Sequence, residues 1–418
     1  MKFIHAADIH LDSPMVGLER YDGAPVDELR GATRKAFENL IRLAIDEAVD
    51  FVLMVGDIYD GNWRDYNTGL YFIRQMAELR QHGIRVYLVS GNHDAANRMS
   101  RELTLPDNVH HFSAKRAETI TDDHLHIAVH GQSYRTAELK ENLAAGFPGS
   151  VPGRFNIGLL HTGVTGRPGH AHYAPCSLDN LTAHNYDYWA LGHIHQREEM
   201  HRAPWVVMPG NIQGRHIRET GEKGCTLVTV EGGVVSAVEH RSLDVVRWSV
   251  LEVATDQTET VDEALDLAVS ACEEMLAGCN ERLLAVRIVF TGTTSAHARL
   301  LGEQEHWQEV LRSLLLGQFG ERLWAEKILF KTAGLAHGEA EGNDSLALLL
   351  DAVGNDHDLA DLMAAERSEI DTVLAKIPLE LREQLELPDL DNPDDLNALF
   401  AEVREMLPSL LTLKRESQ

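Results

Sequence analysis

The fold is set by a stretch at the start of the chain, Lys2-Phe3-Ile4-His5-Ala6-Ala7-Asp8-Ile9-His10. A short, mainly apolar run of this kind favours a buried β-strand. An acid and a histidine, two residues apart, follow the run at once. Four later runs have the same character and also end at polar residues. The five runs are Lys2–Ala7, Phe51–Val55, Arg85–Ser90, Phe155–Leu160 and Asp187–Leu191.

The polar residues after these runs are of types that bind metal ions. They are Asp8, His10, Asp57, Asn92, His93, Asp94, His161, His193 and His195. Side chains at the carboxyl ends of strands in an α/β fold meet in one crevice. Carboxylate, imidazole and amide ligands together suit Mn, Fe or Zn better than an all-oxygen Ca site. The pattern therefore predicts an α/β fold with a two-metal centre.

The spacing within these blocks supports two metal positions. Because strand residues alternate with period two, Asp8 and His10 lie on one face and can hold one ion together. His193 and His195 repeat that geometry with two imidazoles, and the two oxygens of Asp57 are enough to bridge two ions. Ions about 3.5–4 Å apart would orient and deprotonate a bridging water for an in-line displacement. Hydrolysis of a phosphoester is the reaction that needs this arrangement most.

Composition bounds the class of protein. The chain has 418 residues, of which 44% are hydrophobic, and no apolar run approaches the ~20 residues that span a bilayer. Met1 leads straight into the first strand, so we expect no secretory signal. The four cysteines form no CxxC pair, which makes a metal or disulfide role improbable. These features predict a cytoplasmic protein that does not enter a membrane.

Charge is distributed unevenly. The formal net charge is −27, which argues against a broad basic surface for nucleic acid. Roughly 20 acidic and 6 basic residues lie from Glu339 to the end, about half of the whole excess, and such asymmetry signals a separate region. Two bound dications would make the cleft of the first half locally positive. The acidity weakens a nucleic-acid function without excluding it.

The order of elements predicts four parts. In residues 1–243, strands alternate with helices, which we expect at Gly31–Asp50 and Trp63–His82. This part ends in three β-like runs (205–208, 226–230 and 234–240), which suggest a second sheet. Residues 244–333 have a β-α-β-α-β order typical of a small α/β capping domain. Residues 334–343 read as a linker, and 344–418 as an acidic helical region. We expect that last region to dock a partner.

The blocks together resemble the motifs of the calcineurin-like metallophosphoesterase superfamily, over about the first 240 residues. These motifs are D-x-H, G-D-x-x-D (Gly56–Asp60), G-N-H-D and G-H-x-H. The resemblance implies two packed mixed β-sheets flanked by helices. It also implies the two ligand sets. One ion would take Asp8, His10, Asp57 and His195, and the other Asp57, Asn92, His161 and His193.

The resemblance gives further residues a role. His93 matches the family's non-ligand histidine, which protonates the leaving oxygen or stabilises charge, and Asp94 would orient it. Asp60 is expected to orient the loop or a ligand, with a simple turn residue as the alternative. Arg215 and His216 lie in a Gly-rich loop that could approach substrate phosphates. A tight structural loop is an equally good interpretation.

The sequence around the first motif (His5–Pro14) and the order of the parts resemble the double-strand-break repair nuclease branch, the SbcD- and YhaO-like DNA exonucleases. That resemblance implies a capping domain that contacts DNA, a tail that docks on the coiled-coil base of an ABC-type ATPase, and a possible homodimer. An apolar stripe at helical spacing between Leu396 and Leu411 suits such docking, or packing on the chain's own domains. Ile9, where an aromatic residue often follows the Asp, departs from better-known members.

These observations predict a Mn²⁺-dependent DNA nuclease, exonuclease-like and active in DNA repair or processing. It would hydrolyse phosphodiester bonds by a metal-bridging hydroxide and work with the ATPase; Fe or Zn could replace Mn. A phosphodiesterase for nucleotides or other small phosphoesters is the alternative. A third hypothesis, an interaction scaffold with a residual metal site, is disfavoured by the intact ligand set.

Overall fold

The structure is a computed structural model that describes residues 1–13, 24–60, 66–96, 104–139, 141–164 and 175–335, together with 367 and 392. By contacts between Cα atoms the chain forms two compact units. One contains Met1–Val250, Met275–Arg287 and Phe319–Glu326, and the other contains Leu251–Glu274, Ile288–Gln318 and Lys327–Gln418. The expected helical region 344–418 and most of the linker 334–343 lie outside the described residues.

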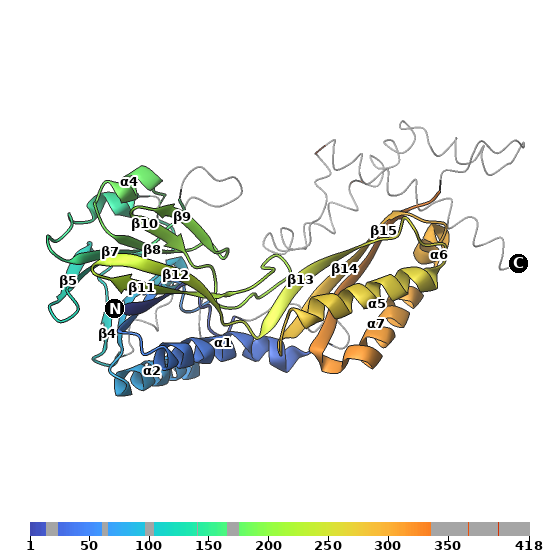
Figure 1. The fold of residues 1–418 in the computed structure, drawn as a ribbon, viewed down its shortest axis with the longest axis horizontal. Coiled ribbons are helices and arrows are strands. Elements are labelled where there is room, and N and C mark those ends of the chain that lie inside the picture. The colour runs from blue at the N-terminus through green and yellow to red at the C-terminus, as the bar shows by residue number, and fades with distance from the viewer. Residues whose placement is uncertain are drawn as a thin grey trace, which may run out of the picture. The chain divides into compact units, whose positions relative to one another are not determined.

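The first unit is built on two six-stranded mixed sheets (Figure 1), as the resemblance implied. The first sheet has the order β12-β11-β1-β2-β3-β4, in which β1 to β4 are parallel and β11 and β12 are antiparallel additions. Its strands are β1 (Lys2–Ala6), β2 (Phe51–Val55), β3 (Arg85–Val89), β4 (Val109–His111), β11 (Gly224–Glu231) and β12 (Val234–Ser242).

The second sheet has the order β5-β6-β7-β8-β10-β9, with a parallel centre from β6 to β10. Its strands are β5 (Glu118–Asp122), β6 (Ile127–Gly131), β7 (Phe155–His161), β8 (Tyr188–Gly192), β9 (Glu198–Arg202) and β10 (Trp205–Met208). The runs after His195 were expected to form this sheet, but only the first of them does. The other two, β11 and β12, join the first sheet, because β11 pairs with β1.

Alternation along the strands creates a layered core. In β2, Phe51, Leu53 and Val55 pack between the two sheets, whereas Val52 and Met54 pack against helices on the outer face. Those helices are α1 (Val26–Asp46) and α2 (Tyr66–Gln81), which lie along the first sheet in Figure 1. The outer face of the second sheet is covered by the short helices η3 (Leu143–Gly146) and α4 (Leu178–Thr182). Strands buried on both faces explain the continuous apolar runs.

One helix begins earlier than its sequence pattern indicated. The expected start was Gly31, but α1 begins at Val26, directly after Pro25, and runs through the glycine. Asp27 and Glu28 occupy its first turn, where negative charge is stabilised by the helix dipole. The polar residues just before Gly31 therefore belong to the helix.

Residues 246–333 contain the expected β-α-β-α-β order. Their elements are β13 (Val246–Ala254), α5 (Val261–Ala277), β14 (Leu283–Thr293), α6 (His297–Gly302), α7 (Gln304–Phe319), η4 (Gly320–Arg322) and β15 (Leu323–Ala333). The three strands form one sheet in the order β13-β14-β15. Among the described residues, no helix combines the length and the apolar character needed to cross a membrane.

Candidate metal centre

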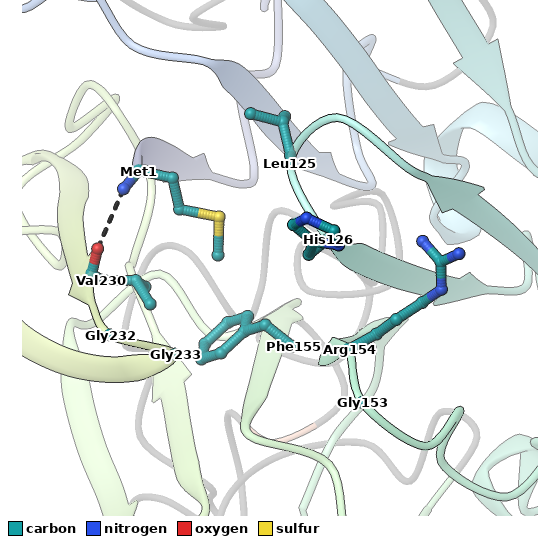
Figure 2. A pocket seen from close by; sticks show the side chains of 9 residues that line it. All are labelled: Met1, Leu125, His126, Gly153, Arg154, Phe155, Val230, Gly232 and Gly233. Carbon is teal, nitrogen blue, oxygen red and sulfur yellow. Dashed lines mark hydrogen bonds between the residues drawn. The ribbon is translucent and has the colours of Figure 1, made fainter.

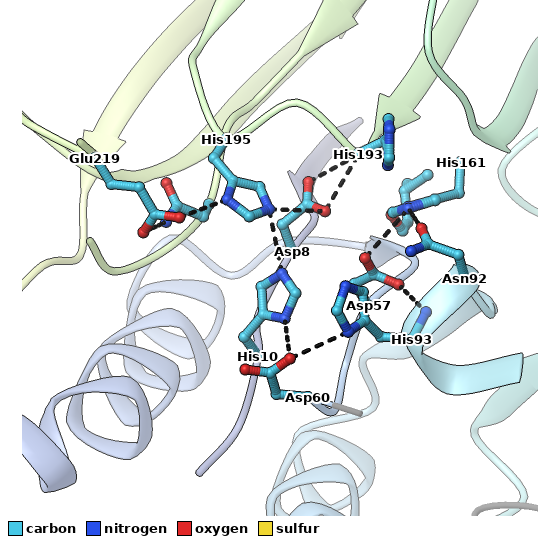
Figure 3. Close-up of polar contacts among 12 residues, drawn as sticks. Asp8, His10, Asp57, Asp60, Asn92, His93, His161, His193, His195 and Glu219 are labelled. Carbon is cyan, nitrogen blue, oxygen red and sulfur yellow. Dashed lines mark hydrogen bonds and ion pairs between the residues drawn. The ribbon is translucent and has the colours of Figure 1, made fainter. Parts of the chain in front are cut away.

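The predicted ligands converge at the carboxyl ends of strands in both sheets (Figure 3). Asp8 and His10 follow β1, Asp57 follows β2, and Asn92 begins the short helix α3 (Asn92–Ala96) after β3. His161 is the last residue of β7. His193 and His195 follow β8. Parallel strands present their carboxyl ends at one edge, which is why residues almost 190 positions apart in the chain meet there.

Asp8, His10 and His195 form the first cluster, in which one potential ligand atom of each residue lies within 4.8 Å of the others. Nε2 of His10 is 3.2 Å from Nε2 of His195, which in turn is 3.8 Å from Oδ1 of Asp8. The buried Nδ1 of His10 has no hydrogen-bond partner among the described residues. Two imidazole nitrogens that face each other beside a carboxylate are suited to share a cation.

Asp57, His161 and His193 form the second cluster, with ligand atoms again within 4.8 Å of one another. Nε2 of His161 lies 3.4 Å from Oδ2 of Asp57 and 3.0 Å from Oδ1 of Asn92. Its other nitrogen, Nδ1, is 3.0 Å from the carbonyl oxygen of Val55. A backbone carbonyl on the far nitrogen is a usual support for a histidine that binds a metal.

The two clusters fit a pair of divalent ions by the chemistry of their donors. Each combines a carboxylate with imidazoles, the ligands of Mn, Fe or Zn. Burial and then the charge of Arg215 lower the pKa of His10 to about 3, so this ring is neutral near pH 7, the form that binds metals. The clusters group Asp57 with His161 and His193, and its expected second role, as the bridge to the first ion, stays a prediction.

Opposite charges meet in the second cluster. Burial lowers the pKa of His161, but the charge and hydrogen bond of Asp57 outweigh burial and raise the pKa of this ring to about 9. Burial likewise raises the pKa of Asp57, and the charge of His161 more than reverses that change, so this pKa falls well below its usual range. Without an ion the pair holds a proton where a cation would otherwise lie.

The backbone at the centre is strained. Four of the candidate ligands have positive φ: Asp8 (51°), His10 (47°), Asp57 (51°) and His193 (109°). Non-glycine residues adopt such angles only where the surrounding structure imposes them, at a cost of order 1–3 kcal/mol each. Five other non-glycine residues in the described part of the chain, among them Asp12 and Ala48, also have positive φ, so such strain is not confined to the candidate ligands.

Two motif glycines are required by close approach. A Cβ atom on Gly91 would lie 2.2 Å from Oδ1 of Asp57, and one on Gly56 would lie 2.2 Å from Nδ1 of His161. Gly56 also has a φ of 79°, which favours glycine. The G-D and G-N-H-D motifs therefore contain glycine because a candidate ligand from another strand, His161 of β7 or Asp57 after β2, occupies the space of a side chain.

His93 lies beside the ligands, but its partner differs from the one expected. Nδ1 of His93 is 3.1 Å from Oδ1 of Asp60. The carboxylate of Asp94 instead accepts the backbone N–H groups of Tyr59 and Gly91, at 3.0 and 2.9 Å. The expectation that Asp94 orients His93 was therefore wrong, because that carboxylate turns inward to join two loops. Asp60, which had been left between two interpretations, takes the position beside the ring.

The charge around His93 favours its protonated form. Burial lowers the pKa of this ring, but the hydrogen bond with Asp60 and the charges of Asp57 and Asp60 outweigh burial and raise it. The side chain is 39% exposed, far more than that of His10 or His161. A protonated imidazole that is open to solvent beside two ligand clusters can donate a proton to a bound molecule.

Glu219 is a site residue that the sequence analysis missed. Its Oε1 lies 2.6 Å from Nδ1 of His195, and its Oε2 accepts the backbone N–H of Arg215 at 2.8 Å. Burial raises the pKa of Glu219, but the hydrogen bond with His195 and the charge of Arg215 hold it well below the usual range. The only signal in the sequence was an acid four residues after Arg215, which is too common to single out.

The two residues suggested for phosphate contact lie near the centre in different ways. Arg215 is largely buried, with Nη2 2.9 Å from Oε1 of Glu219 and Nη1 3.3 Å from Oδ2 of Asp60. His216 has a half-exposed side chain whose Nε2 is 3.7 Å from Oε1 of Glu219. Their loop is therefore part of the wall of the centre, and the guanidinium already pairs with two carboxylates.

A separate cavity of about 430 Å³ lies far from these residues (Figure 2). Its walls include Met1, Phe155 and the turn at Gly232 and Gly233. Met1 and Phe155 mark the amino ends of β1 and β7, whereas the ligands lie at the carboxyl ends. This cavity is therefore not part of the metal centre.

Comparison with known proteins agrees with this geometry. Residues 1–197 match the family described as calcineurin-like phosphoesterase, and residues 248–333 match the middle domain of metallophosphoesterase YhaO. The chain is 36% identical to the uncharacterized metallophosphoesterase YhaO of Bacillus subtilis over 303 residues, which cover 70% of this chain and 72% of that protein.

Two archaeal proteins are more distant relatives. The DNA double-strand break repair protein Mre11 of Sulfolobus acidocaldarius is 22% identical, over 69% of this chain and 75% of its own length. Mre11 of Methanocaldococcus jannaschii is 25% identical, over 64% of this chain and 72% of its own length. The motifs, the two packed sheets and these relatives agree: the chain belongs to the calcineurin-like metallophosphoesterase superfamily.

Proposed function

We propose that the chain is a dinuclear-metal phosphodiesterase that acts as a DNA nuclease, exonuclease-like, in DNA repair or processing in the cytoplasm. The observation that carries this proposal is the pair of ligand clusters, Asp8–His10–His195 and Asp57–His161–His193, at one edge of a phosphoesterase fold. The choice of DNA as substrate is supported by the relatives named as double-strand break repair proteins.

The residues of the centre would divide the work. Two divalent ions, most simply Mn²⁺, would supply an activated water and stabilise charge on the attacking and leaving oxygens. His93, which lies outside these two clusters but in a third group with His10 and Asp60, would donate its proton to the leaving oxygen. Asp60 would hold Nδ1 of that ring, 3.1 Å away, so that Nε2 is the atom that meets the substrate.

The charge of the chain argues that it does not hold DNA alone. Residues 248–333 contain 14 acidic and 7 basic residues, and several of the arginines are paired, such as Arg287 with Glu326 and Arg282 with Asp244. Duplex affinity depends on free basic groups. We therefore propose that an ABC-type coiled-coil ATPase supplies most of the affinity for DNA. A homodimer of this chain would add to that affinity.

The same acidity favours a second candidate function. A phosphodiesterase for nucleotides or other small phosphoesters would use the same metal chemistry and would need no basic track along its surface. It would turn over bis-p-nitrophenyl phosphate or cyclic nucleotides well and show no affinity for duplex DNA that depends on salt.

The test uses the purified full chain, linear duplex DNA and Mn²⁺, with and without chelator. We expect cleavage that needs Mn²⁺ and that falls about 10²–10⁴-fold in His93→Ala, while binding of two ions is retained. His82, exposed after α2, provides a histidine control, and His82→Ala should leave cleavage unchanged. Turnover of small diesters without DNA cleavage, in the presence of the ATPase as well, would select the second candidate instead.

A further inference from the structure

The geometry points to Glu219 as a positioning residue that sets the affinity of the metal position formed by Asp8, His10 and His195. This inference rests on the proposed function only through the metal centre, not through the choice of substrate. It concerns a residue outside every motif, on the loop between β10 and β11.

Glu219 has its two oxygens fixed in different directions. Oε1 lies 2.6 Å from Nδ1 of His195, a short contact between a buried carboxylate and a partly buried ring. Oε2 accepts N–H groups from the backbone of Arg215 at 2.8 Å and from the side chain of Asn211 at 2.9 Å. Because Asn211 is fully buried, the carboxylate cannot rotate without breaking bonds inside the core.

The contact on Nδ1 decides what Nε2 of His195 can do. With Nδ1–H donated to Glu219, the lone pair is on Nε2, which faces Nε2 of His10 at 3.2 Å and Oδ1 of Asp8 at 3.8 Å. A carboxylate that fixes the tautomer and the ring plane in this way strengthens a metal ligand, and its loss typically costs 10–100-fold in affinity.

Arg215 completes the arrangement as the counter-ion. Its Nη2 donates to Oε1 of Glu219 at 2.9 Å and its Nη1 to Oδ2 of Asp60 at 3.3 Å. The guanidinium therefore holds in place the carboxylate beside His195 and the one beside His93. This geometry gives Arg215 a positioning role where the sequence had suggested a contact with phosphate.

The other metal position is supported differently, and this makes the inference testable. Nδ1 of His161 pairs with the carbonyl oxygen of Val55, a backbone atom that no side-chain substitution removes. A change at Glu219 should therefore weaken one of two binding steps and leave the other unchanged. A residue that merely stabilised the fold would weaken both steps together.

The experiment titrates Mn²⁺ into the full apo-protein by calorimetry, without substrate, and counts bound ions by electron paramagnetic resonance. We expect Glu219→Ala to weaken one step about 10–100-fold, and Glu219→Gln, whose amide oxygen still accepts from Nδ1, to weaken that same step less. His195→Ala identifies the step that belongs to the first position. Glu199→Gln is the matched control, because Glu199 is likewise a glutamate paired with arginine, here Arg197 and Arg202, but lies on β9.

A folding defect has its own control. If Glu219→Ala unfolds because Arg215 keeps only one of its two carboxylate partners, Asp60, the double variant Arg215→Met with Glu219→Gln, which leaves the net charge unchanged, is titrated in its place. Equal loss at both steps, or no loss at either in a folded variant, would overturn the inference. A wild-type protein that binds no Mn²⁺ would instead count against the metal centre of the proposed function.

Discussion

The ring of His93 meets the carboxylate of Asp60, with 3.1 Å between Nδ1 and Oδ1. Asp60 also accepts hydrogen bonds from Ser13 at 2.6 Å and from Arg215 at 3.3 Å, so its position is fixed from three sides. Asp94, although adjacent to His93 in the chain, serves the backbone of two loops instead. Substitution of Asp60 should therefore affect turnover, whereas substitution of Asp94 should affect stability.

Asp60→Asn should lower the turnover of phosphodiester about 10–100-fold with little change in melting temperature, because it weakens the support of His93 while keeping the side chain's shape. Asp94→Ala should act on stability, since it leaves two buried N–H groups unpaired, at about 1–3 kcal/mol each. Steady-state kinetics and thermal melts of both variants separate these effects. If Asp94→Ala alone reduced turnover in a stable protein, the assignment of Asp60 would be wrong.

Gly91→Ala should reduce Mn²⁺ affinity, since the added Cβ would lie 2.2 Å from Oδ1 of Asp57 and must displace that carboxylate. Gly317, in the last turn of α7, has open space around its Cβ position. Gly317→Ala is therefore a matched control that should keep Mn²⁺ binding and gain up to about 1 kcal/mol in stability. Calorimetric titration compares the two variants, and equal Mn²⁺ affinity in both would contradict the steric explanation.

Acid should unfold the protein partly through His5, which is fully buried between the sheets, with Nδ1 3.0 Å from the Tyr188 hydroxyl and Nε2 2.9 Å from the Leu191 carbonyl oxygen. Burial lowers the pKa of His5 from 6.5 to about 3. Between these values the unfolded chain binds a proton that the folded chain does not, so stability is complete above pH 6.5 and falls as the pH drops toward 3, by about 1.4 kcal/mol per pH unit.

The measurement compares urea unfolding of the wild type and His5→Gln between pH 7 and pH 5, both with chelator present. Glutamine does not titrate, so the variant should lose less stability over this interval than the wild type. Parallel losses in the two proteins would show that His5 is not a source of acid sensitivity.

Duplex DNA affinity of the isolated chain should be low and should depend only weakly on salt. Non-specific binders reach Kd values of about 10⁻⁴–10⁻⁶ M at physiological salt by neutralising phosphates, and a chain with net charge −27 should lie at or beyond the weak end. Fluorescence anisotropy over a salt series measures both quantities. Tight binding with a steep salt slope would remove the need for a DNA-binding partner.

The clustering of the candidate ligands could be predicted from the sequence because their positions follow from local rules. A buried run ends, a polar residue follows, and parallel strands bring such ends together, as with Asp57 after β2 and His161 at the end of β7. The helix α5 (Val261–Ala277) takes the first helical place in the β-α-β-α-β order expected for residues 244–333.

The features that could not be predicted from the sequence depend on contacts between residues far apart in the chain. The pairing of β11 with β1 joins residues more than 200 positions apart, so periodicity could not assign β11 to its sheet. The strand β5 (Glu118–Asp122) is too polar to resemble a buried strand. Glu219 acts through contacts that only the folded chain creates, and an isolated acid in a loop gives no warning of them.

The left-handed backbone at Asp8, His10, Asp57 and His193 has a consequence for protein engineering. At those positions a glycine would relieve of order 1–3 kcal/mol of strain each, so removing a ligand could make the apo-protein harder to melt. Selection of random variants for heat resistance alone should therefore favour proteins that are more stable but have lost metal ligands. Only a screen that also demands turnover would keep these four residues in place.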